Sequence, residues 1–188
     1  MNRKQDQRQQ THDEILAAAR RLFRADGYKP TGIGQIMDSI GLTVGGFYNH
    51  FESKDALFRE VVDRTINEST EVAAAGETDS AQFVRRIANQ YLSTEHRDDP
   101  AGGCLLPALS AEVARADEDV RAAYTRSLTH GVDKMSENMV ARDGRSAQER
   151  AWAVTALSVG GLLLSRAVND EALSQCILAA CRETAEQI

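Results

Sequence analysis

The sequence predicts an all-α protein, and three observations lead to that prediction. Its 188 residues include only three prolines, whereas the helix-favouring residues Ala, Leu, Glu, Arg and Gln are abundant. Apolar residues recur at intervals of three and four along most of the chain, as on one face of a helix. Capping residues and glycines divide these stretches. We expect about nine helices and no strand, arranged as a small N-terminal helical domain and a larger helical domain.

The first predicted helix follows a polar N-terminal segment. Residues 1–10 lack the apolar core of a signal peptide, and we expect them to form a flexible arm. Thr11 and Glu14 are spaced as in a capping box, which starts a helix. Apolar residues then recur at helical spacing until Gly27, which can end the helix in the left-handed conformation.

Two short helices are expected next. Thr31 would cap the first, which ends at Gly41, and Thr43 would cap the second, which reaches His50. A short helix, a tight turn with glycine and another short helix make a candidate helix-turn-helix, a motif that places its second helix on DNA. Other helical hairpins share this pattern.

Six further helices complete the predicted fold. Their expected bounds are 53–76, 80–96, 104–115, 117–143, 146–168 and 170–186. The first of them fades near Gly76, and residues 97–103 form a loop by composition. Ser146 and Glu149 form a second capping box.

The charge of the chain is unevenly distributed. The net charge is −6, but residues 1–59 carry 9 Lys/Arg against 7 Asp/Glu, a net of +2, whereas residues 60–188 carry 13 against 21, a net of −8. DNA binding depends on the local field at the contact surface, so an acidic body with a mildly basic end is compatible with it.

Other features predict a cytoplasmic protein without a metal or cofactor. The longest apolar-leaning stretch, residues 151–164, is shorter than the about 20 residues of a membrane span. The three cysteines, Cys104, Cys176 and Cys181, form an odd set without paired spacing, which favours reduced thiols over disulfides or a metal site.

The segment from Thr31 to Leu57 resembles the DNA-binding signature of the TetR family of transcriptional regulators. It reads TGIGQIMDSIGLTVGGFYNHFESKDAL and matches about ten positions of the family pattern in order, including the aromatic-Tyr pair, His-Phe and Lys-x-x-Leu. Met37 and Ile40 depart from the smaller residues usual in the family. Both are apolar, so we interpret them as repacking.

The resemblance implies roles for individual residues. Those matching the base-reading positions of the third helix are Thr43, Val44, Gly45 and Asn49. Those matching positions that hold the DNA backbone are Thr31, Tyr48, His50 and Lys54. The resemblance further implies a DNA-binding domain at 11–58, a ligand-binding and dimerisation domain at 59–188, a homodimer formed through the last two helices, and a small-molecule effector.

The residues of the third helix also have a physical reading of their own. Gly45 and Gly46 cost about 1 kcal/mol each relative to Ala in a helix. They allow either close packing against a neighbouring helix or a close approach of the backbone to base edges. Tyr48, His50 and Lys54 supply a hydroxyl, an imidazole and an ammonium group for phosphate oxygens, although His50 fits an ordinary surface position as well.

Cys104 is the most distinctive residue of the larger domain. Its helix starts with the segment Gly102-Gly103-Cys104-Leu105-Leu106, and this Gly-Cys-aliphatic start resembles that of some TetR-like repressors that respond to electrophiles or oxidants. A helix N-terminus lowers the pKa of a thiol and raises its reactivity. The alternative is a small buried residue at a helix start, since free cysteine is among the most buried residue types.

A ligand pocket and a dimer interface are the remaining expectations. Candidate pocket residues are Phe83, Ile87, Tyr91, Leu105, Leu109, Tyr124, Leu128, Met135, Met139 and Trp152. All of them fit a hydrophobic core equally well. The helix over 151–161 is rich in small residues, which permits close approach of another helix, either within the chain or across a dimer.

The sequence therefore predicts a sequence-specific DNA-binding regulator. The resemblance to the TetR family implies a repressor, which leaves a palindromic operator when a small molecule or a thiol-reactive signal arrives. The four histidines are scattered and no catalytic triad or phosphate loop is present, so we do not expect an enzyme. The alternative is a helical ligand- or protein-binding module that does not bind DNA.

Overall fold

The computed structural model describes residues 3–74 and 79–188, with the backbone only for 65–74. Its helices are α1 (Arg3–Asp26), α2 (Ile33–Asp38), α3 (Val44–Phe47), α4 (Lys54–Ala74), α5 (Ser80–Tyr91), α6 (Thr94–Asp98), α7 (Leu105–Val113), α8 (Glu118–Ser136), α9 (Ala147–Ala167) and α10 (Glu171–Gln187). The extended pairing found in the described residues is a single bridge between Arg142 and Arg145. The all-α fold class is confirmed.

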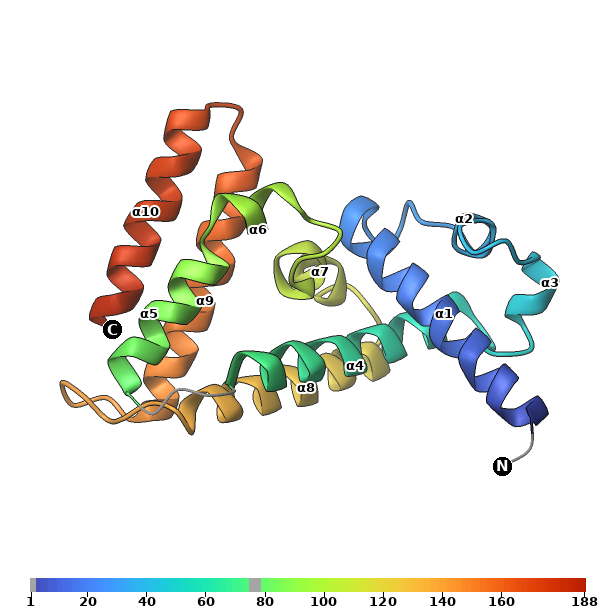
Figure 1. Cartoon of the computed structure of the whole chain (residues 1–188), viewed down its shortest axis with the longest axis horizontal. Coiled ribbons are helices and arrows are strands. Elements are labelled where there is room, and N and C mark those ends of the chain that lie inside the picture. Colours follow the sequence, from blue (N-terminus) through green and yellow to red (C-terminus); the bar gives the residue numbers. More distant parts are fainter. Residues whose placement is uncertain (1–2, 75–78) are drawn as a thin grey trace.

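The helices form two regions joined by α4 (Figure 1). The first three helices lie at one end of the molecule, and α5, α9 and α10 lie at the other. Helix α4 runs along α8 between the two regions, and α7 lies next to the C-terminal end of α1. No helix in the described part of the chain is both long enough and apolar enough to cross a membrane.

One hydrophobic core joins α1–α4 to α7. Its fully buried members include Ile15, Ala19, Phe23, Ile36, Met37, Phe47, Leu57, Phe58, Leu105 and Leu109. The residues from α7 lie beyond the expected domain boundary at residue 58, so the packing of the N-terminal region continues into the larger one.

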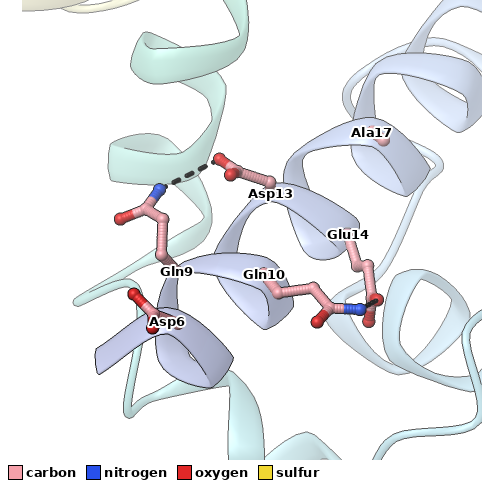
Figure 2. Close-up of a pocket in the computed structure, with 6 residues that line it drawn as sticks. All are labelled: Asp6, Gln9, Gln10, Asp13, Glu14 and Ala17. Atoms are coloured by element: carbon pink, nitrogen blue, oxygen red, sulfur yellow. Dashed lines mark hydrogen bonds between the residues drawn. The ribbon is translucent and has the colours of Figure 1, made fainter. Parts of the chain in front are cut away.

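The prediction of a flexible arm over residues 1–10 was wrong for the part that the structure describes. Helix α1 begins at Arg3, so Thr11 lies inside the helix and does not cap it. The Gln9 side chain donates a hydrogen bond to Asp13 at 3.1 Å, and Gln10 donates one to Glu14 at 3.0 Å (Figure 2). Such pairs four positions apart support a helix, and the lysine, glutamine and arginine residues before Thr11 favour one.

Larger differences from the expected bounds occur at α5 and α8. The helix predicted over 80–96 is divided, because α5 ends at Tyr91 and the Ser93 hydroxyl accepts a hydrogen bond from the His96 N–H at 3.1 Å, which caps α6. Helix α8 ends at Ser136 instead of residue 143. The end expected near Gly76 lies outside the described residues. The capping box of Ser146 and Glu149 is confirmed.

The helix rich in small residues, α9, makes a close contact within the chain. A Cβ added to Gly161 would lie 2.8 Å from Cys181 Sγ of α10 and 3.0 Å from Leu92 Cδ2. At this position the expected close approach is therefore intramolecular. Gly160 has nothing within 4 Å of an added Cβ, and Trp152, Leu163 and Leu164 are exposed along the same helix.

Candidate DNA-binding site

Helix α3 presents one face to the core and one to the outside. Thr43 occupies the N-cap position, and the helix itself is shorter than expected, covering Val44–Phe47. The backbone continues as turns, in which the His50 N–H donates to the Phe47 carbonyl at 2.9 Å. Phe47 is fully buried, whereas Val44 is 44% and Tyr48 59% exposed. The outward face also carries Thr43, Gly45 and Asn49.

The glycines of α3 are not explained by packing within the chain. A Cβ added to Gly45 would meet nothing closer than Thr43 Oγ1 at 3.9 Å, and one added to Gly46 would lie 3.7 Å from Met37 Cε. Both distances are ordinary van der Waals contacts. Close packing against a neighbouring helix, the first alternative for these glycines, is therefore not observed. The outward Gly45 leaves backbone accessible on the face that carries Val44 and Asn49.

Lys54 is held by the segment that follows α1. Its Nζ lies 4.2 Å from the centroid of the Tyr28 ring and 3.4 Å from the Lys29 carbonyl oxygen, to which it donates a hydrogen bond. Burial lowers the pKa of Lys54, whereas the charges of Asp55 and Glu112 raise it. The ammonium group stands at the first residue of α4, where a helix N-terminus favours anions.

Tyr28 is a site residue that the sequence analysis missed. Its hydroxyl donates to the Asp55 carboxylate, and its ring stacks on Phe58 with centroids 4.1 Å apart. Burial raises the pKa of Tyr28 above its usual value, and the Asp55 hydrogen bond adds to the effect. The available signal was an aromatic residue directly after Gly27, the glycine that ends α1.

His50 lies beside a second group of contacts from α1. The Arg8 guanidinium donates to the Asn49 carbonyl at 2.9 Å, and the His12 ring lies 6.1 Å from that of His50. Partial burial lowers the pKa of His50, and the charges of His12 and Arg8 lower it further. Arg8 and His12 were missed because the arm and the face of the first helix were assigned no role.

Thr31 does not join the outward residues. Its side chain is fully buried, and its hydroxyl donates a hydrogen bond to the Gly27 carbonyl at 2.7 Å. The expectation that this side chain holds the DNA backbone is therefore wrong for this conformation. The hydroxyl instead fixes the turn between α1 and α2.

A pocket on α1 lies within the same region but has the wrong charge for DNA. Figure 2 shows its lining, which all comes from this helix: Asp6, Gln9, Gln10, Asp13, Glu14 and Ala17. Three of these side chains are carboxylic acids, which repel phosphate groups. This face of α1 is therefore a boundary of the candidate DNA-binding surface.

Cys104 does not have the environment expected of a reactive thiol. It caps α7, and its Sγ accepts a hydrogen bond from the Leu106 N–H at 3.5 Å. Burial nevertheless raises the pKa of the Cys104 thiol, which is opposite to the expected effect of the helix N-terminus. A Cβ on Gly103 would lie 2.7 Å from His96 Nε2, so the close approach of the His96 ring explains the glycine at this position.

The structure brings Tyr91 and Tyr124 together near Cys104, but the other predicted pocket residues are spread over separate clusters. Leu105 and Leu109 belong to the core shared by α1–α4 and α7, with Tyr124 packed against it. Phe83 and Met139 belong to a second core, against which Ile87 and Met135 pack. Leu128 contacts both cores, and Tyr91 packs on a third cluster around Leu92. Trp152 is 38% exposed, so its assignment to an interior pocket was wrong.

Comparison with known proteins gives the family. Residues 15–61, which include α2, α3 and Lys54, match the model of the bacterial regulatory proteins of the tetR family. The transcriptional regulator LmrA of Bacillus subtilis is 29% identical over 182 residues, which cover 89% of this chain and 94% of LmrA. The chain belongs to the TetR family. It is a DNA-binding transcriptional regulator.

Further relatives of this TetR-family regulator agree in fold. The repressor NemR of Escherichia coli K12 is 27% identical over 131 residues, covering 68% of this chain and 66% of NemR. The crystal structure of reduced E. coli NemR superposes with a TM-score of 0.79 at 21% identity, covering 95% of this chain and 96% of that one. A TetR regulator from Legionella pneumophila gives 0.75 at 21% identity, with 100% and 97% covered. These relatives are named as regulators, not enzymes.

Proposed function

We propose that this TetR-family protein acts as a homodimeric repressor that binds a palindromic operator through α3 and leaves it when an effector binds the larger domain. The observation that carries the proposal is the two-sided build of α3. Buried Phe47 anchors the helix, while Val44, Gly45 and Asn49 face outward without a packing reason for the glycine. A helix with this exposure fits the major groove, where side chains reach base edges.

Contacts to the DNA backbone would come from residues beside α3. Tyr48 is exposed, and His50 and Lys54 are partly exposed around the same end of the molecule. Hydroxyl, imidazole and ammonium groups donate hydrogen bonds to phosphate oxygens, which fix the register of a protein on the duplex. Arg8, bound to the Asn49 carbonyl, adds a positive charge next to these groups.

The dimer would form through α9 and α10. Leu163 and Leu164 of α9 and Leu173 of α10 are each about half exposed, at 49%, 58% and 48%. Large exposed apolar side chains on adjacent helices favour a partner surface. A second copy related by a two-fold axis would place two α3 helices on one duplex, which requires a palindromic site.

A relative supports the repressor mode. NemR, one of the relatives, is named a repressor. A thiol-reactive signal sensed at Cys104 is disfavoured because burial raises the pKa of that thiol. We therefore favour a small molecule that binds the larger domain without forming a covalent bond. We also propose that the protein is not an enzyme.

Selection from random duplex DNA by the purified protein tests this function. The wild type should enrich a palindrome, and the Tyr48→Ala, Lys54→Ala double variant should lose it. The control is Lys134→Ala, which removes a positive charge from α8, where Lys134 pairs with Glu137 at 3.1 Å. Binding should weaken steeply with salt, because phosphate contacts release counterions. Absence of enrichment at low salt would favour the alternative of a helical module that does not bind DNA.

A further inference from the structure

Glu112 of α7 holds the backbone of the segment that joins α1 to α2. Its Oε2 accepts a hydrogen bond from the Tyr28 N–H at 2.7 Å, and its Oε1 accepts one from the Lys29 N–H at 3.1 Å. Both oxygens of one carboxylate thus bind two consecutive amides, which lie 84 and 83 positions earlier in the chain. Such charge-assisted bonds to two donors are stronger than neutral ones and fix geometry.

The joining segment is shaped to receive this carboxylate. Gly27 has φ +89°, and a Cβ added to it would lie 3.5 Å from Glu112 Oε2, so the carboxylate packs directly on the glycine. On its other side the segment is fixed by the Thr31 hydroxyl, which donates to the Gly27 carbonyl. The α1–α2 segment therefore has a defined position relative to α7.

The same two residues hold Lys54. The Lys54 ammonium group lies over the Tyr28 ring at 4.2 Å and donates to the Lys29 carbonyl at 3.4 Å. Glu112 therefore acts on Lys54 through the two residues whose amides it binds. Displacement of either amide moves the ring or the carbonyl that places the ammonium group.

The other end of α7 is also joined to α1. The Arg24 guanidinium of α1 donates to the Gly103 carbonyl, immediately before α7. Between the two ends, Leu105, Leu109 and Val113 are buried in the core shared with α1–α4. Helix α7 is thus attached to the DNA-binding region at both ends and along one side.

We propose that Glu112 is a positioning residue for DNA binding, which places Lys54 through Tyr28 and Lys29 and so couples α7 to the DNA contact. The inference rests on the proposed DNA-binding function. Loss of the Glu112 charge should therefore change DNA affinity in the direction opposite to that expected from charge alone. Loss of an acidic group near DNA ordinarily strengthens binding by reducing repulsion, whereas loss of Glu112 weakens it.

The test compares Glu112→Gln with the wild type on the duplex that the wild type selects from random DNA. The amide keeps one acceptor oxygen and turns its NH₂ toward the other backbone N–H, so one of the two bonds is lost. We expect binding about tenfold weaker, with a salt slope lower by about one, as for one lost phosphate contact. Glu118→Gln, the same charge change at an exposed position of α8, should not weaken binding. Unfolding curves at the same temperature establish that each variant is folded.

Two further measurements separate positioning from a general loss of structure. In a Lys54→Ala background, Glu112→Gln should cause no additional loss of binding. Without DNA, the ε-methylene protons of Lys54 should be shifted upfield by the Tyr28 ring in NMR spectra, and the shift should diminish in Glu112→Gln but not in Glu118→Gln.

If Glu112→Gln binds the selected duplex with wild-type affinity and wild-type salt slope, the inference is wrong, although the proposed DNA-binding function would still hold. An unchanged Lys54 shift in that variant would overturn it equally. If the wild type selects no duplex, the proposed function fails, and the role of Glu112 in DNA binding fails with it; a diminished Lys54 shift would then support only the contact between Glu112 and the Lys54 site.

Discussion

The imidazole ring of His12 stacks on the ring of Phe51, with centroids 4.4 Å apart and planes at 22°. The His12 Nε2 also lies 2.9 Å from a carboxylate oxygen of Glu60. One side chain of α1 therefore contacts both the segment after α3 and helix α4, and it does so next to His50.

His12→Ala is expected to lower the free energy of unfolding by about 1–2 kcal/mol, because it removes an aromatic contact and a hydrogen bond to a carboxylate. Urea denaturation monitored by circular dichroism measures the change. His130→Ala, at an exposed position of α8, is the matched control and should change stability by less than about 0.5 kcal/mol. Equal effects of the two substitutions would show that the His12 contacts do not stabilise the fold.

Gly45→Ala and Gly46→Ala should separate DNA binding from stability. Neither new methyl group meets an atom closer than 3.7 Å, so both variants should fold and gain up to about 1 kcal/mol from the helix propensity of alanine. The Gly45 methyl would face outward and should reduce operator binding at least about tenfold, whereas the Gly46 methyl would face Met37 and change binding little. Measuring both quantities on both variants is the check, and full operator affinity in Gly45→Ala would show that α3 does not approach the bases closely.

The helix-turn-helix could be predicted because its signals are local. Thr43 before α3, Gly41 in the turn and the aromatic residues after Gly46 are all read within a few positions. Gly41 has φ +70°, which explains why glycine stands in this turn. The contacts that hold this unit in place could not be predicted in the same way. They join residues 48 positions apart, for His12 and Glu60, or 84 apart, for Tyr28 and Glu112.

The errors at the N-terminus and at Cys104 have a common physical cause. Thr11 and Glu14 have the spacing of a capping box, but the same spacing occurs inside a helix that continues through Thr11. Cys104 stands at a helix N-terminus, where the hydrogen bond from the Leu106 N–H lowers the pKa of the thiol, but burial raises it by more. In both cases the local sequence pattern was present, but the structure around it determined the outcome.

The stability of the fold should fall below about pH 6.5, and His96 should account for part of the loss. His96 Nε2 accepts a hydrogen bond from the Cys104 N–H at 3.0 Å, and its Nδ1 lies 2.8 Å from the Tyr91 carbonyl, an arrangement that requires neutral imidazole. Burial lowers the pKa of His96 in the folded state. The unfolded chain therefore binds more protons as the pH falls through the ordinary histidine value, and stability is present above that value and lost below it.

Urea denaturation of the wild type and His96→Gln at a series of pH values from 7.5 down to 5 measures this effect. The variant should be less stable than the wild type at pH 7.5 and should lose less stability on acidification. His130→Gln should reproduce the wild-type pH dependence. Parallel curves for His96→Gln and the wild type would mean that His96 takes up its proton equally in the folded and unfolded states.

The three cysteines should react with a thiol reagent in the order of their exposure. Cys176 is exposed on α10, whereas Cys181 and Cys104, which stands at the start of α7, are both partly buried. Burial raises the pKa of Cys104, and the thiolate is the reactive form, so its labelling at pH 7.5 should be at least about tenfold slower than that of Cys176.

Single-cysteine variants, with the other two residues replaced by serine, allow each rate to be measured by mass spectrometry. In urea, where burial is lost, the rates should become similar. Labelling of folded Cys104 at the rate of Cys176 would show that the N-terminal end of α7 opens readily, and a thiol-reactive effector would then become the better hypothesis.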